Sequence, residues 1–145
     1  MKITTFIDKD REEEVIVYLK ENSDLPDKIA KLLEPTPLPL IGYTDAEAVA
    51  LDPDGIYCFT VEGGKVYALT ERERFQLRER LYAIEEALGD DFVKINQSCL
   101  VNVKKIARFD ASLGGSLLVK LKNGYGDYVS RRQLKTVKER IGLRL

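Results

Sequence analysis

Residues 92–102 read Phe-Val-Lys-Ile-Asn-Gln-Ser-Cys-Leu-Val-Asn, and this stretch decides the fold class. Two short runs of apolar and β-branched residues lie on either side of the polar triplet 96–98. Runs of this length and composition, bounded by polar residues, are typical of β-strands. We therefore predict one strand over 91–95 and a second over 99–103.

The neighbouring segments also favour strands. Residues 56–61 and 65–69 flank Glu62-Gly63-Gly64, whose glycines supply the positive φ that a hairpin turn needs. A second hairpin is predicted over 117–129, because Asn123-Gly124 is a strong turn signal. The main part of the chain is therefore expected to be mostly β.

Two helices are predicted from capping signals and apolar spacing. Thr70-Glu71-Arg72-Glu73 is a capping box, apolar residues follow it at helical spacing, and Gly89 can end the helix. This pattern predicts a helix over 70–88. Ser130 can cap a final helix over 131–141.

The first part of the chain has its own pattern. Residues 1–7 and 15–19 favour short strands, and a helix follows before the prolines at 35, 37 and 39, which favour a stiff linker. We expect a small β-β-α segment over 1–36, a Pro-rich linker over 37–43 and the main domain over 44–145. The small segment is expected to mediate dimerisation or to receive a regulatory signal.

Composition excludes several classes of function. The 145-residue chain is 44% hydrophobic and 32% charged, which suits one domain with a real core. It holds no histidine, so Ser-His-Asp and Cys-His nucleophiles are excluded, and Cys58 and Cys99 cannot complete a zinc site alone. We expect no enzyme, no cofactor or metal, and no small-molecule substrate. The lack of a membrane-length apolar run or signal peptide predicts a cytoplasmic protein with reduced cysteines.

The net charge of −1 hides an asymmetry. Residues 1–45 carry a net −4 and residues 46–91 a net −6, whereas residues 92–145 carry 12 Lys or Arg against 3 Asp or Glu, a net +9. A basic third can attract phosphates while acidic surface elsewhere limits non-specific binding. The asymmetry favours an anionic partner, although charges scattered over a solvated surface would give the same count.

The stretch 92–102, with Ile106 after it, resembles the central motif of the LytTR DNA-binding domain. Weaker matches occur in the same order as in that family: Asp54-Gly55-Ile56, the predicted helix ending at Leu88, residues 121–124 and residues 129–132. The resemblance covers about residues 44–145. It implies an elongated antiparallel β fold with short helices, used by bacterial transcription regulators.

The resemblance also implies a way of binding DNA. Members of this family present loops, rather than a recognition helix, to successive major grooves at direct-repeat sites in double-stranded DNA. Fewer than 50 residues precede the domain, too few for a receiver domain, so the chain is similar to the short stand-alone regulators. Some of these work beside a membrane protein that restrains them, so the partners considered for this chain are an inhibitory membrane protein and a second copy in a homodimer.

Carried over by position, the resemblance implies a set of DNA-binding residues. Asn96 and Gln97 match residues that touch bases or phosphates, although many members have His or Ser at the first position and Arg or Lys at the second. Asn and Gln can still pair with adenine in the major groove. The full set is Lys65, Lys94, Asn96, Gln97, Ser98, Lys104, Lys105, Arg131 and Arg132.

Structural alternatives stand beside these roles. Asn96 and Gln97 can form a plain turn, Lys104 and Lys105 can be ordinary solvated lysines, and Asn102 is expected to satisfy backbone groups inside the fold. The function predicted is sequence-specific DNA-binding regulation of transcription through loops that read the major groove. The alternative is a protein-interaction module that sequesters a regulator without binding DNA. A single-stranded RNA binder is less favoured, because no aromatic platform interleaves the basic residues.

Overall fold

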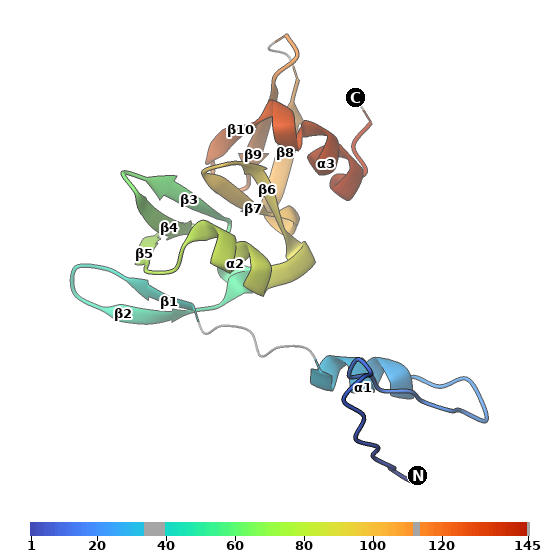
Figure 1. The fold of residues 1–145 in the computed structure, drawn as a ribbon. Coiled ribbons are helices and arrows are strands. Elements are labelled where there is room, and N and C mark those ends of the chain that lie inside the picture. Colours follow the sequence, from blue (N-terminus) through green and yellow to red (C-terminus); the bar gives the residue numbers. More distant parts are fainter. Residues whose placement is uncertain (34–39, 112–113, 145) are drawn as a thin grey trace. The chain divides into compact units, whose positions relative to one another are not determined.

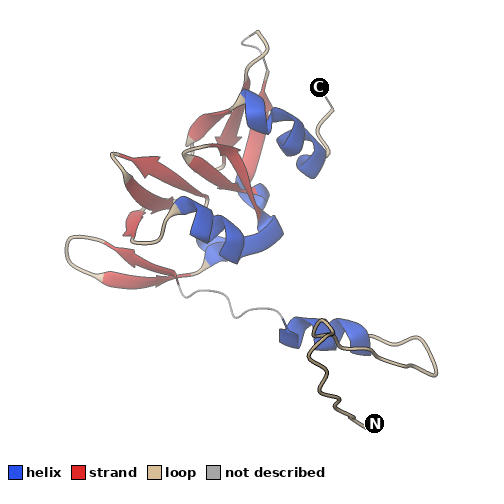
Figure 2. Ribbon diagram, viewed as in Figure 1, coloured by secondary structure: helices blue, strands red, loops and turns tan. Residues whose placement is uncertain are grey.

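The protein is described by a computed structural model that covers residues 1–33, 40–111 and 114–144. The chain forms two compact units, Met1–Thr36 and Pro37–Leu145 (Figure 1). Strands are the main secondary structure of the second unit, and short helices accompany them (Figure 2). Within the described ranges, every helix lacks the length and apolar character needed to cross a membrane.

The first unit contains the helix α1 (Leu25–Leu33), and residues 1–24 follow an irregular path without strands. The strands that we predicted over 1–7 and 15–19 are therefore absent from this structure. A strand needs a hydrogen-bonded neighbour, and an isolated two-stranded hairpin is marginal in water. Most of the large apolar side chains of both segments are exposed, so the described residues of this unit supply them no core.

Two antiparallel sheets build the second unit (Figure 1). Sheet A has seven strands in the order β2-β1-β5-β4-β3-β7-β6, and sheet B has three in the order β10-β9-β8. The strands of sheet A are β1 (Leu40–Tyr43), β2 (Ala48–Leu51), β3 (Cys58–Glu62), β4 (Lys65–Leu69), β5 (Arg74–Leu77), β6 (Phe92–Asn96) and β7 (Cys99–Asn102). Those of sheet B are β8 (Ile106–Asp110), β9 (Leu117–Leu121) and β10 (Gly126–Val129). The predicted mostly β, antiparallel architecture is confirmed.

The start of sheet A differs from the prediction. Residues 40–43, which we assigned to the end of the linker, form β1, and residues 37–39 of that linker lie outside the described residues. Gly42 permits this strand, because a Cβ atom there would lie 2.6 Å from the Cβ of Phe75. The close approach of β1 to β5 therefore depends on a glycine that the sequence pattern did not single out.

The central strands of sheet A are packed on both faces. On one face, α2 (Leu81–Leu88) covers a core in which the Phe59 and Phe92 rings lie 5.4 Å apart. On the other face, sheet B and α3 (Arg131–Ile141) cover a second core that contains Val93, Ile95 and Val101. Because both faces are buried, the two runs within residues 92–102 are nearly continuous in apolar residues rather than alternating.

The helix predicted over 70–88 was wrong in its first half. The Thr70 hydroxyl accepts the N–H of Glu73 at 3.1 Å, but the Thr70 N–H also donates to the Glu73 carbonyl at 2.9 Å, which closes a turn instead of starting a helix. Residues 74–77 then pair with β4 as β5. The helix begins only at Leu81, and Gly89 ends it with φ of 66°.

The two predicted glycine-containing hairpin turns are present. Gly63 and Gly64 join β3 to β4 with φ of 57° and 77°, and Gly124 lies between β9 and β10 with φ of 90°. These conformations favour glycine, because a Cβ atom clashes with the backbone there. The turns set the register of both hairpins.

Asn102 is 2% exposed and holds the connection between β7 and β8. Its Nδ2 donates to the Ile56 carbonyl at 2.9 Å, and its Oδ1 accepts the N–H of Lys104 at 3.0 Å. The side chain therefore satisfies buried backbone groups, as its sequence context indicated.

We expect Asn102→Ala to lower the free energy of unfolding by about 2 kcal/mol, because the Ile56 carbonyl would be left buried without its donor. Urea denaturation of the full chain measures this change. Gln97→Ala, at an exposed position, serves as the control and should change stability by less than about 0.5 kcal/mol. Equal stability of the two variants would contradict the structural role of Asn102.

Candidate nucleic-acid interface

The β6–β7 turn, residues 96–98, lies at one end of sheet A. Asn96 ends β6, and its Nδ2 donates to Asp127 Oδ2 at 3.0 Å and to the Tyr128 carbonyl at 2.8 Å. Its Oδ1 accepts the N–H of Ser98 at 2.8 Å. The register between β6 and β7 shifts at this point. The Asn96 amide therefore fastens the turn to β10 and is fully engaged inside the protein.

Gln97 is the side chain that the turn presents to solvent. It is exposed, and its amide has no hydrogen-bond partner within the described parts of the chain. An exposed primary amide can both donate and accept, which is what the edge of adenine requires. The geometry gives Gln97 the freedom to contact a ligand, whereas Asn96 is held in place.

The β3–β4 hairpin lies beside this turn. The Val61 N–H donates to the Ser98 carbonyl at 2.9 Å, and Thr60 faces Cys99 across the β3–β7 pair. Lys65 follows the glycines of the hairpin and is exposed. The structure therefore brings Lys65 and the β6–β7 turn to the same end of sheet A.

The junction between β10 and α3 borders the turn on its other side. The Ser130 N–H donates to the Ile95 carbonyl at 2.8 Å, which fixes the start of α3 against β6. Arg131 and Arg132 follow and are both exposed. Ser130 occupies the N-cap position of α3, but its hydroxyl makes no capping hydrogen bond.

Two acidic residues near this end of the domain, Glu62 and Asp127, have partners, whereas Glu79 has a buried carboxylate oxygen without one among the described residues. Glu62 forms an ion pair with Arg74 at 3.0 Å, and Arg74 also lies over the Tyr67 ring at 3.7 Å. The two carboxylate oxygens of Asp127 accept from Asn96 and from its neighbour's backbone N–H. Exposed cations and an exposed amide therefore remain to face an anionic, hydrogen-bonding ligand.

Comparison with known proteins decides the family. Residues 46–142 match the family described as the LytTr DNA-binding domain. The chain belongs to the LytTR family. It is 34% identical over 104 residues to an uncharacterized HTH-type transcriptional regulator of Staphylococcus aureus strain NCTC 8325. This alignment covers 72% of this chain and 71% of that protein. A counterpart in strain MRSA252 matches with the same identity and coverage.

A solved LytTr DNA-binding domain from Bacillus cereus has the same fold. It superposes with a TM-score of 0.67 at 19% identity, over 71% of this chain and 95% of that domain. In the present LytTR domain, α2 and α3 are separated in sequence by five strands, so they do not form a helix-turn-helix pair.

Two lysines predicted to bind DNA lie away from this end of the LytTR domain. Lys104 and Lys105 lie past the opposite end of β7, where Lys104 is 3.8 Å from Asp91 and Lys105 lies over the Tyr57 ring at 5.1 Å. The structure does not bring these two lysines together with the β6–β7 turn. Lys94 is half-buried in the middle of β6, two residues before Asn96.

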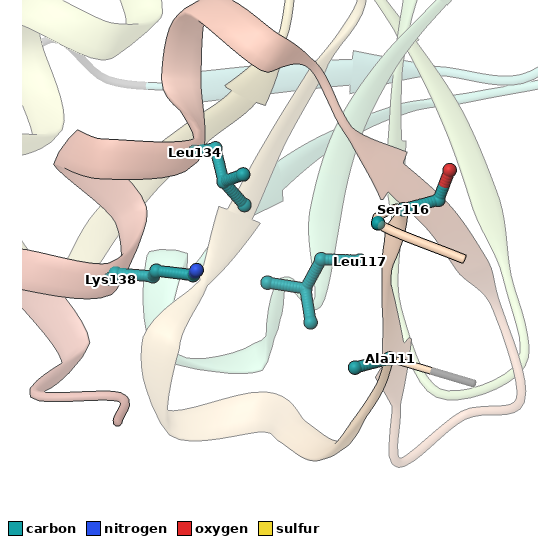
Figure 3. Close-up of a pocket in the computed structure, with 6 residues that line it drawn as sticks. Ala111, Ser116, Leu117, Leu134 and Lys138 are labelled. Atoms are coloured by element: carbon teal, nitrogen blue, oxygen red, sulfur yellow. The ribbon is translucent and has the colours of Figure 1, made fainter. Parts of the chain in front are cut away.

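Residues between the sheets are structural. Cys58 and Cys99 are fully buried, and the neighbouring Cys58 thiol together with burial raises the pKa of Cys99, so this thiol stays protonated near neutral pH. The Tyr125 hydroxyl lies 3.3 Å from that of Thr60, and burial raises its pKa. A shallow hollow of about 100 Å³ between α3 and the β8–β9 connection, which Leu134 and Lys138 line, holds none of the predicted site residues (Figure 3).

Arg78 and Arg80 are exposed residues that the sequence analysis did not select. They follow β5 and line a hollow that Lys65 also lines. Their position was hidden because the sequence pattern placed them inside a helix over 70–88. The sequence signal that could have identified them is the group of arginines that follows the predicted hairpin over 56–69.

We expect Asn96→Ala to loosen the β6–β7 turn, because the substitution removes three hydrogen bonds that hold it. Hydrogen exchange of the Ser98 amide, measured by NMR, should accelerate by at least about fivefold, since its own bond to Asn96 Oδ1 is worth about 1 kcal/mol. Gln97→Ala keeps all three bonds and should leave this exchange rate unchanged. Unaltered Ser98 protection in Asn96→Ala would show that the turn does not depend on the amide.

Proposed function

We propose that this protein is a transcription regulator that binds double-stranded DNA sequence-specifically through one end of sheet A. The observation that carries the proposal is the convergence of three connections: the β3–β4 hairpin, the β6–β7 turn and the β10–α3 junction. Backbone hydrogen bonds link each of them to its neighbour. The naming of its relatives as transcriptional regulators supports the regulatory role.

The proposed division of labour follows from exposure and hydrogen bonding. Arg131 and Arg132 are exposed cations that can contact backbone phosphates, which set affinity and register. Gln97 has a free amide and is placed to read a base edge in the major groove. Asn96, whose amide is engaged, positions Gln97 instead of reading a base itself. Ser98 contributes its backbone to the same turn.

The N-terminal unit is proposed to join two copies of the protein. The hydrophobic residues of α1 include Leu32 and Leu33, which are 84% and 63% exposed. An amphipathic helix with an uncovered apolar face gains stability when it packs on a partner. A dimer of this kind would bring two LytTR domains to one DNA molecule. An inhibitory membrane protein is a further partner proposed for the same surface, and a cytoplasmic location follows from a role on DNA.

We expect Gln97→Ala and Arg132→Ala to weaken DNA binding in different ways. Duplexes selected from a random library by the wild-type protein are compared with scrambled duplexes by fluorescence anisotropy at several salt concentrations. Gln97→Ala should lower the preference for selected over scrambled duplexes by about 1–3 kcal/mol, because it removes a base contact. Arg132→Ala should weaken both equally and reduce the salt slope by about 1.

Two outcomes would count against this proposal. Equal losses on selected and scrambled duplexes for Gln97→Ala would remove its role as a base reader. A wild-type protein that selects no sequence and shows no salt-dependent binding would contradict DNA binding as the function.

We expect Leu32→Glu in the full chain to convert a dimer into a monomer, since a charge on the apolar face of α1 opposes burial. Light scattering of both proteins at the same concentration measures the molar mass. Lys28→Glu changes the charge of the same helix on an exposed, ion-paired side chain and should leave the mass unchanged. If Leu32→Glu has the mass of the wild type, α1 does not form the dimer contact.

A further inference from the structure

Residues 15–19, Val-Ile-Val-Tyr-Leu, are an apolar segment of the N-terminal unit whose backbone has open hydrogen-bonding groups. Within the described residues, no hydrogen bond involves a backbone group of this segment. Its side chains are exposed apart from the half-buried Val17, and Tyr18 is 92% exposed. A β-branched, apolar segment with open N–H and C=O groups is a template for pairing with another strand.

Charged residues of opposite sign flank this segment. Glu14 precedes it and Lys20 follows it. Glu14 is paired with Arg11 at 2.9 Å, but both side chains are more than half exposed. An exposed pair of this kind contributes little to stability and can be exchanged for another pair. The flanking charges are therefore available to set the register of a strand contact.

The segment and its flanking charges are complementary to themselves in the antiparallel direction. If two copies pair about a two-fold axis at Val17, each Glu14 lies opposite the partner's Lys20. Ile16 then lies opposite the partner's Tyr18, and a β-branched residue across from an aromatic one stabilises a sheet. One register therefore satisfies the charges and the apolar side chains together.

The same register limits the pairing to two copies. One step beyond the flanking charges, Glu13 would lie opposite the partner's Glu21, and like charges directly opposite each other destabilise a sheet. The paired ribbon therefore ends before these positions. A two-fold contact uses the same surface on both copies, so association closes at the dimer. The segment thus fits a second copy of this chain.

Residues 1–7 can supply the outer strands of the paired ribbon. Two strands alone are marginal in water, so the ribbon needs further strands or a covering helix. Residues 1–7 have β-branched and aromatic side chains, and a turn separates them from the segment, in which the Asp10 N–H donates to Asp8 Oδ1 at 3.0 Å. Two copies together provide four strands.

The helix α1 can cover one face of this sheet. Side chains alternate between the faces of a strand, so Val15, Val17 and Leu19 share one face, which becomes entirely aliphatic in the pair. Leu32 and Leu33 of α1 are exposed. An aliphatic sheet face and the apolar side of a helix bury each other as two layers.

We propose that residues 15–19 pair in antiparallel register with the same residues of a second copy, centred on Val17, so that the N-terminal unit forms its sheet only in the dimer. This inference rests on the proposed dimerisation through the N-terminal unit and adds the strand contact and its register. It accounts for the irregular path of a segment with strong strand propensity, since a strand forms when a neighbour supplies its hydrogen bonds.

Cysteine cross-linking in the full chain tests the register. Val17→Cys places two thiols across the two-fold axis, where paired Cα atoms lie about 4.5–5.5 Å apart, within reach of a disulfide. A mild oxidant should convert most of this variant to a covalent dimer. Val15→Cys is the matched control, because its two copies would lie four residues apart along the ribbon, roughly 13 Å. The wild type controls for the two native cysteines, which are buried.

A charge exchange tests the ends of the ribbon. Glu14→Lys should weaken dimerisation roughly tenfold in sedimentation equilibrium at low salt, because each dimer then contains two like-charged pairs. Glu14→Lys/Lys20→Glu restores opposite charges in the same register and should recover most of the affinity. Glu12→Lys changes the net charge equally at an exposed position outside the ribbon and should alter the dissociation constant by less than about threefold.

The outcomes separate the strand contact from the proposed dimerisation and from DNA binding. If light scattering shows a dimer but Val17→Cys and Val15→Cys cross-link equally, or neither cross-links, the strand contact is wrong and dimerisation through α1 stands. A charge exchange that restores no affinity also overturns the register. If the wild type is a monomer at every concentration, the strand contact and the dimer both fail. Binding of the same samples to selected duplexes decides the DNA-binding proposal independently.

Discussion

The side-chain amide of Asn96 is the contact on which the arrangement of the interface depends. Its Nδ2 donates to Asp127 and to the backbone carbonyl of Tyr128, both in sheet B. Its Oδ1 accepts the N–H of Ser98 in the turn of sheet A. A single residue therefore ties the β6–β7 turn to β10, and β10 leads directly into α3. If this amide were lost, the Ser130 N–H to Ile95 carbonyl bond would still hold α3 against β6, but the turn that carries Gln97 would lose its own attachment to β10.

The two hydrophobic cores explain why the side chain of one residue is enough to fix the β6–β7 turn. β6 and β7 are buried on one face by α2 and on the other by sheet B and α3, so the strands that lead into the turn are fixed by apolar packing. Only the last step, from Ile95 to Cys99, needs polar bonds to define its path. Buried strands supply rigidity, and a few hydrogen bonds at their ends place the groups that face DNA.

The parts of the fold that the sequence predicted correctly are those where local and tertiary signals agree. Residues 92–102, the turn at Gly63-Gly64 and the helix that begins at Arg131 are of this kind. The segment 70–80 was misassigned because the same Thr-to-Glu hydrogen bond can cap a helix or close a turn, and pairing with β4 decides between them. The N-terminal strands failed for a related reason, since strand propensity without a partner forms no ladder. The clamp role of Asn96 had no local signal either, because its partners Asp127 and Tyr128 lie more than 30 positions away.

The distribution of charge also depends on tertiary structure, so the charge of a surface has to be counted from the fold and not along the sequence. By sequence, the positive third begins at residue 92, while residues 46–91 carry a net −6. Yet Lys65, Arg78 and Arg80 come from that acidic stretch, and the order of strands in sheet A places them at the same end of the sheet as the β6–β7 turn. Conversely, Lys104 and Lys105 belong to the basic third but lie past the far end of β7. The sheet thus redistributes charge that looks segregated along the chain, because antiparallel pairing brings every second connection to the same end. An interface made of such connections draws cations from distant segments, and a near-neutral chain can still present a cationic surface to DNA.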